Sequence, residues 1–87
     1  MYLLQMRPEQ IKQAVGRNAP VIIPVGSVEF HGNHLPVGTD FFLVDEIVKR
    51  FEPHVDCVVA PPFVYGCTGY AVSGPETGTL NVRLDSL

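Results

Sequence analysis

Apolar residues recur along this chain with two different spacings, which predict alternating helices and strands. Residues 8–17 carry Ile11, Ala14 and Val15 at the i, i+3, i+4 spacing of a short helix. Residues 20–26 (PVIIPVG) form a compact apolar run without polar alternation, a pattern typical of a strand buried on both faces of a parallel sheet. A strand of this kind needs packed layers above and below it.

The middle of the chain repeats this alternation. Residues 40–51 have the spacing of an amphipathic helix. Four apolar residues are expected on one side of it, and the charged residues lie elsewhere on its surface: Val44, Ile47, Val48 and Phe51 are the apolar ones. Pro53 ends this helix, and residues 56–60 (DCVVA) have the pattern of a second buried strand. The strand, helix and second strand predict an α/β fold with parallel strands and a right-handed crossover.

The remainder of the chain has little regular pattern. Residues 61–78 are rich in proline and glycine without a convincing period, which indicates a long loop of functional importance. Residues 79–82 are predicted to begin a third strand, and residues 84–87 another helix. Because a parallel sheet of two or three strands leaves its hydrophobic faces partly uncovered, we expect residues beyond Leu87, or a partner chain, to complete the core.

Composition and charge narrow the classes of function. The 87 residues are 46% hydrophobic and 17% charged, as in an ordinary globular protein, and the formal net charge is -3. No basic stripe favours nucleic acid or an anionic membrane surface, and no apolar run reaches the length of about 18 residues that spans a bilayer. Without an export signal, Cys57 and Cys67 are expected to be reduced thiols in a cytoplasmic protein. The classes of function that remain are chemistry on a small molecule and contact with another protein.

The residues with the clearest chemistry follow the first predicted strand. Residues 29–40 (EFHGNHLPVGTD) place two carboxylates and two imidazoles at the carboxyl end of that strand, where α/β sheets bind ligands. If Glu29 and His31 extend the strand, their i, i+2 spacing directs both side chains to one face. Carboxylate and imidazole ligands suit zinc, and mixed sites of this kind also bind manganese or iron. We therefore predict a metal site at Glu29, His31 and Asp40.

Structural roles are the alternatives for the same residues. Asp40 immediately precedes a helical run, where an aspartate often caps the helix N-terminus. A single histidine such as His31 is often a hydrogen-bonded structural residue, and His54 beside Pro53 is expected to be one. His34 is a candidate for orienting the loop or for accepting a hydrogen bond from the free N–H of a metal ligand. Spacing alone does not decide between metal binding and these structural roles.

A longer pattern contains these residues. The run PVGSVEFHGNHLPVGTD at residues 24–40 resembles the signature of the creatininase family, and the resemblance continues in the helix that follows, in the proline pair at residues 61–62, in Tyr65-Gly66 and in Gly78-Thr79. The resemblance implies a metal-dependent amidohydrolase with two divalent ions, built as a three-layer α/β/α sandwich with a mainly parallel sheet. It also implies a homo-oligomer that hydrolyses C–N bonds of a small-molecule substrate such as a cyclic amide or formamide.

The resemblance further implies a role for each ligand. Glu29 would bind one metal ion, His31 the other, and Asp40 would bridge them. Because the remaining ligands of the family lie later in its chain, we expect residues 1–87 to be the N-terminal part of a single creatininase-like domain. Tyr70 and Ser73 are candidates for contact with substrate, and the general acid is not identified. The alternative is a non-catalytic binding or assembly subunit that keeps the fold with an incomplete metal site.

Overall fold

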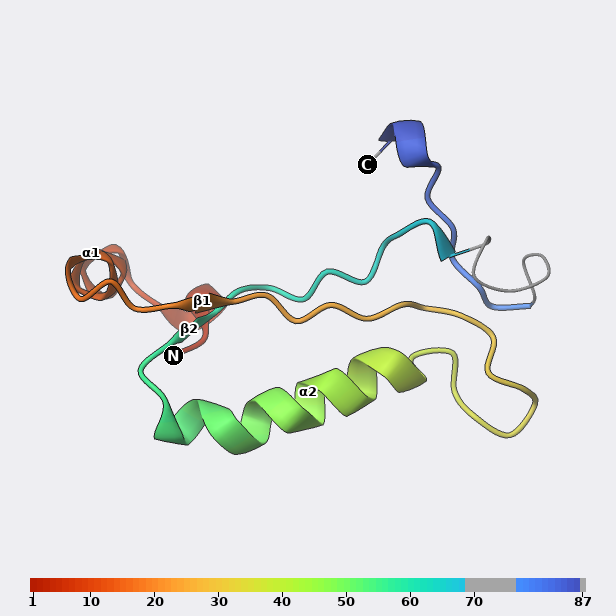
Figure 1. Ribbon diagram of the computed structural model, residues 1–87, viewed down its shortest axis with the longest axis horizontal. Helices are drawn as coiled ribbons and strands as arrows, with labels where there is room; N and C mark the ends of the chain where they lie inside the picture. The colour runs from red at the N-terminus through yellow and green to blue at the C-terminus, as the bar shows by residue number, and fades with distance from the viewer. Residues whose placement is uncertain (69–76, 87) are drawn as a thin grey trace.

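Two extended segments and a helix that runs beside them form the centre of the molecule (Figure 1). The structure is a computed structural model that describes residues 1–68 and 77–86. Its elements in chain order are η1 (Leu3–Gln5), α1 (Pro8–Gly16), β1 (Val21–Ile22), α2 (Thr39–Phe51), η2 (Glu52–His54), β2 (Val58–Val59) and η4 (Leu84–Ser86), where η denotes a 3-10 helix. The first two predicted helices and the first two predicted strands are therefore present, although the regular strands are short.

Strands β1 and β2 pair in parallel, as the sequence predicts. The N–H of Val58 donates to the carbonyl of Pro20, and the N–H of Ala60 donates to the carbonyl of Ile22. Pairing resumes beyond the regular strands, where Val25 and Phe63 form an isolated parallel bridge. The two extended segments thus stay side by side from β1 to the loop that carries the predicted ligands.

The N-terminal residues occupy the other edge of β2, which the sequence analysis did not predict. Tyr2 forms a parallel bridge with Val59, and the N–H of Val59 donates to the carbonyl of Met1 at 2.8 Å. The Met1 nitrogen in turn donates to the carbonyl of Cys57 at 2.7 Å. Strand β2 therefore lies between two extended neighbours, which explains why it is the most buried strand of the described chain.

Helix α2 packs on one face of this sheet. The buried cluster consists of Val48, Cys57 and Val59, and the partly buried residues packed against it are Tyr2, Ile22, Val44 and Phe51. Val48 retains 4% of its accessible surface, whereas Ile47 on the same helix retains 54%. The prediction that Ile47 shares the buried side of the helix is wrong, because Ile47 lies at the edge of the stripe formed by Val44, Val48 and Phe51.

The prediction that residues 20–26 are buried on both faces is also wrong for the described chain. Pro24 is buried on the side of α2, but Val21, Ile23 and Val25 are each 60% exposed. Successive side chains of a strand point to opposite faces, so one apolar set packs against α2 while the other faces away from it. This partial coverage agrees with the expectation that so few strands leave a hydrophobic face open.

Helix α1 packs on the rest of the chain mainly through Ala14, which is buried. Ile11 and Val15, predicted to share its apolar side, are 36% and 71% exposed. The C-terminal end of α1 is joined to the start of β2 by Arg17, whose guanidinium contacts both oxygens of Asp56 at 3.0 and 3.1 Å. The hydrogen bond from Arg17 lowers the pKa of Asp56. Both side chains are exposed, so this ion pair contributes little to stability.

The third predicted strand is absent from the described residues. In the segment 79–82, the N–H of Leu80 donates to Val28 and that of Val82 donates to Gly66, each at 2.8 Å. Because these bonds lead to two separate segments, they form no regular ladder. The helix predicted from residue 84 is a single 3-10 turn over Leu84–Ser86.

Two further expectations concern the cysteines and membrane helices. Cys57 and Cys67 are both free thiols, as the sequence predicts, and Cys57 is buried. None of the helices in the described part of the chain combines the length and apolarity that crossing a lipid bilayer requires.

The packing of α2 predicts the effects of a pair of substitutions. Val48→Ala should lower the free energy of unfolding by about 2 kcal/mol, because it removes buried methyl groups and leaves a cavity. Ile47→Ala on the neighbouring exposed position should change it by less than about 0.5 kcal/mol. Urea denaturation of the two variants measures both values, and equal losses would contradict the observed orientation of α2.

Candidate metal centre

The centre is built where the first turn of α2 lies directly against the end of the first extended segment. A Cβ atom added to Gly26 would lie 2.9 Å from both the N and Cα atoms of Phe41, closer than such contacts occur. Only glycine permits this approach of two backbones. The approach places Asp40, in the first turn of α2, beside the residue that follows Gly26, which is Ser27.

Asp40 does not cap its helix. The N-cap of α2 is Gly38, which has no side-chain cap, and Asp40 lies inside the first turn. Its Oδ2 atom instead accepts a hydrogen bond from the Ser27 hydroxyl at 2.5 Å. This hydrogen bond is the main cause that lowers the pKa of Asp40, and Glu29 and then His31 add to it against the opposing effect of burial. The helix-cap alternative is therefore wrong, and the carboxylate faces the loop of the predicted ligands.

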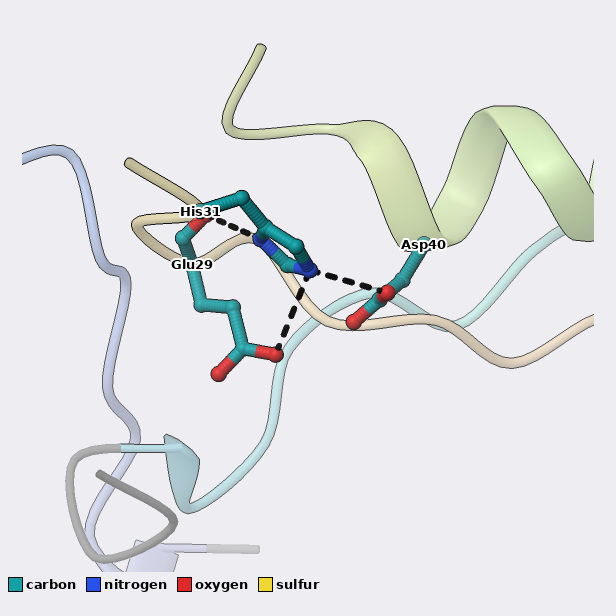
Figure 2. A group of neighbouring side chains, drawn as sticks. All are labelled: Glu29, His31 and Asp40. Carbon is teal, nitrogen blue, oxygen red and sulfur yellow. Dashed lines mark hydrogen bonds and ion pairs between the residues drawn. The ribbon is translucent and has the colours of Figure 1, made fainter. Parts of the chain in front are cut away.

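The His31 ring lies between the two carboxylates (Figure 2). Its Nδ1 atom is 3.0 Å from the backbone carbonyl of Glu29, and its Nε2 atom is 3.1 Å from Asp40 Oδ1 and 3.9 Å from Glu29 Oε1. A carbonyl only accepts, so Nδ1 carries a proton and Nε2 is the nitrogen whose lone pair a metal would use. The bond to the Glu29 carbonyl is the main cause that raises the pKa of His31, and Asp40 adds to it.

Three hydrogen bonds hold the backbone around Glu29. The N–H of Glu29 donates to the carbonyl of Val37 at 3.0 Å, and the carbonyl of Val28 accepts from Leu80 at 2.8 Å. The N–H of Phe30, between the two ligands, donates to Thr79 Oγ1 at 2.9 Å. Thr79 is a supporting residue that the sequence analysis did not identify, and the only signal for it was the Gly78-Thr79 pair in the family pattern.

The three predicted ligands form one group. One ligand atom from each of Glu29, His31 and Asp40 lies within 4.8 Å of the others, and no other group of three such residues occurs in residues 1–68 and 77–86. Their side chains are 17%, 23% and 40% exposed, so a cation can reach them from solvent. Two carboxylates repel each other at this distance unless a positive charge lies between them. Two oxygen donors and one imidazole nitrogen suit zinc, manganese or iron.

The other candidate residues lie outside this group. His34 is exposed, and its ring lies over Gly32, where an added Cβ atom would be 3.0 Å from the ring atoms Nδ1 and Cε1. Its support of the centre stays a prediction. His54 is exposed at the end of η2, and its role as a hydrogen-bonded structural residue stays a prediction. Tyr70 and Ser73 lie outside the described residues.

A cavity adjoins the centre through Ser27. Its volume is about 240 Å³, and it lies between the two extended segments beyond their last backbone hydrogen bonds. Its lining residues are Val25, Gly26, Ser27, Phe63, Tyr65, Gly66 and Thr68. Most of this lining is apolar or aromatic, so the space next to the centre suits an uncharged group better than a charged one.

Several known proteins are similar to this chain in sequence or in fold. Residues 4–87 match the family described as Creatininase, creatinine amidohydrolase. The chain is 37% identical over 83 residues to 3-dehydro-scyllo-inosose hydrolase of Thermotoga maritima, covering 95% of this chain and 26% of the relative. It is 41% identical over 63 residues to the mycofactocin precursor peptide peptidase of Mycolicibacterium smegmatis, covering 66% and 26%. The chain therefore spans about a quarter of the length of these relatives.

A solved structure extends the likeness to the fold. A mutant creatininase, Zn-Zn type, superposes with a TM-score of 0.78 at 22% sequence identity, covering 94% of this chain and 33% of that one. At this identity the likeness concerns the fold. It confirms the α/β class with a parallel sheet and helices that the sequence predicts.

The contact at Gly26 predicts the effect of the smallest possible side chain. Gly26→Ala should push the first turn of α2 away from the sheet, destabilise the protein by about 1 to 3 kcal/mol and weaken cation binding at Asp40. Gly16→Ala is the matched control, because a Cβ atom there would meet nothing within 4 Å. Thermal unfolding and calorimetric titration with Zn²⁺ measure the two effects. A Gly26→Ala variant indistinguishable from Gly16→Ala would contradict the close approach.

Proposed function

The chain belongs to the creatininase family, and we propose that the full-length protein is a metal-dependent hydrolase whose centre includes Glu29, His31 and Asp40. The observation that carries this proposal is the convergence of two carboxylates on the Nε2 atom of His31, at 3.1 and 3.9 Å. A structural histidine would need one hydrogen-bond partner on this side. Two anionic partners, with the opposite nitrogen already bonded to a carbonyl, favour a site for cations.

By the family resemblance, the three residues would hold two divalent ions, with zinc favoured and manganese or iron as alternatives. Glu29 would hold one ion and His31 the other, while the two oxygens of Asp40 would bridge them. A divalent ion held here would polarise a carbonyl and lower the pKa of bound water to about 7. Three residues are too few for two ions, so further ligands would come from parts of the full-length protein outside the described residues.

The residues of this chain would prepare the reaction in defined ways. Glu29 and Asp40 supply the negative charge that retains the ions, and the bond from Nδ1 of His31 to the Glu29 carbonyl keeps Nε2 directed at them. The reaction is the addition of water across a C–N bond, with oxygen going to carbon and a proton to the leaving nitrogen. The substrate would be a small molecule with a cyclic amide, formamide or related bond.

The names of the relatives support hydrolysis and leave the substrate open. One is an inosose hydrolase and another a peptide peptidase, so both carry out hydrolysis on different substrates. A homo-oligomer in the cytoplasm is part of the proposal. The alternative, a binding or assembly subunit without catalysis, would keep Glu29, His31 and Asp40 but lack the remaining ligands.

Metal analysis of the purified full-length protein tests this proposal. It should contain close to two divalent ions per subunit. His31→Ala or Asp40→Asn should lower this content sharply, because each substitution removes an atom proposed to bind metal. Chelation should abolish hydrolysis of amide substrates, and added Zn²⁺ or Mn²⁺ should restore it.

His54→Ala is the matched control, because it removes an exposed imidazole far along the chain from the centre. It should leave metal content and hydrolysis unchanged. Metal content that is equal in wild type, His31→Ala and Asp40→Asn would refute the assignment of the centre. Bound metal without hydrolysis of amide, peptide or inosose substrates would favour the non-catalytic alternative.

A further inference from the structure

We infer that Ser27 is a positioning residue of the metal centre, whose hydroxyl sets the orientation of the Asp40 carboxylate. The inference rests on the proposed function, since it concerns how the proposed ligands are held. Its basis is a pair of contacts from one atom. Ser27 Oγ lies 2.5 Å from Asp40 Oδ2 and 3.0 Å from Glu29 Oε1, so a single hydroxyl touches both carboxylates.

The hydroxyl has one proton, and the distances decide where it goes. Hydrogen bonds from a hydroxyl to a carboxylate are about 2.5 to 2.7 Å long, so the proton is directed to Asp40. Glu29 Oε1, at 3.0 Å from the same hydroxyl, is the alternative acceptor of this proton. Ser27 therefore holds Asp40 through the shorter bond and keeps Glu29 within hydrogen-bonding distance of the same hydroxyl.

The bond to Oδ2 controls which oxygen of Asp40 faces the centre. The terminal torsion of an aspartate has a broad range, so the carboxylate rotates unless a contact holds it. With Oδ2 held by Ser27, Oδ1 faces His31 Nε2 (Figure 2), and the two atoms are 3.1 Å apart. The same rotation determines how the two oxygens would be divided between two ions.

The position of Ser27 itself is fixed by its neighbours. It follows Gly26, whose backbone is in close contact with Phe41, the residue after Asp40. Ser27 and Asp40 are thus brought together by two adjacent backbone segments that have no room to shift. Ser27 also lines the cavity of about 240 Å³, which offers space beside it for an added methyl group.

The test compares Ser27→Ala and Ser27→Thr in the full-length protein. Zn²⁺ affinity is measured by competition with a chelator, and the Co²⁺-substituted protein is examined by visible absorption, which reports ligand geometry. Ser27→Ala should lower Zn²⁺ affinity about 10- to 100-fold, as expected for loss of a group that orients a ligand, and should alter the Co²⁺ spectrum. Ser27→Thr restores a hydroxyl and should recover most of the affinity and the wild-type spectrum.

The melting temperature of the metal-free protein separates positioning from general stability. It should be nearly the same in wild type, Ser27→Ala and the control Ser86→Ala, whose serine is exposed in η4 and lies outside the ligand group. Wild-type affinity and spectrum in Ser27→Ala would overturn the inference while leaving the proposed function intact. A loss of affinity that follows the metal-free melting temperature without rescue by threonine would also overturn it. A wild-type protein that binds no Zn²⁺ would overturn the proposed function itself.

Discussion

The contact between Gly26 and the first turn of α2 is the constraint on which the arrangement of the candidate centre depends. An added Cβ atom would lie 2.9 Å from the Phe41 backbone, so any other residue would force the helix and the extended segment apart. The contact brings Ser27 within 2.5 Å of Asp40 and allows the same carboxylate to approach His31. Three residues from two elements then share one small volume, and the backbone holds them there before any cation binds.

The electrostatics of this volume explain why it suits a cation. Glu29 and Asp40 both direct oxygens at Nε2 of His31, and the Glu29 carbonyl accepts from Nδ1 of the same ring. The arrangement raises the pKa of His31 because a second ring proton would be attracted by these groups. A divalent ion supplies more positive charge than a proton and accepts the same lone pairs, so the geometry serves metal binding well.

The sheet that presents the centre is covered by α2 on one face. Val48 packs against Cys57 and Val59, while Val21, Ile23 and Val25 on the opposite side of the first extended segment are each 60% exposed. Parallel sheets are normally covered on both faces. The described residues therefore form one helix layer and part of one sheet layer of the α/β arrangement to which the family belongs, and the candidate centre lies at the carboxyl end of the sheet, where this class of fold binds ligands.

Features that depend on residues close together along the chain could be predicted from the amino-acid sequence alone. The helical spacing of residues 8–17 and 40–51 and the apolar runs that pair as β1 and β2 are local patterns. Glu29 and His31 lie beyond the regular strand, so strand alternation does not account for their proximity. Tertiary structure decided what depends on distant residues. It showed that Asp40 bonds to Ser27 instead of capping its helix, that Thr79 supports the backbone of Phe30, and that Tyr2 lies beside β2. Periodicity describes which side of an element is apolar, but only packing determines which distant segment lies against that side and how closely two backbones approach.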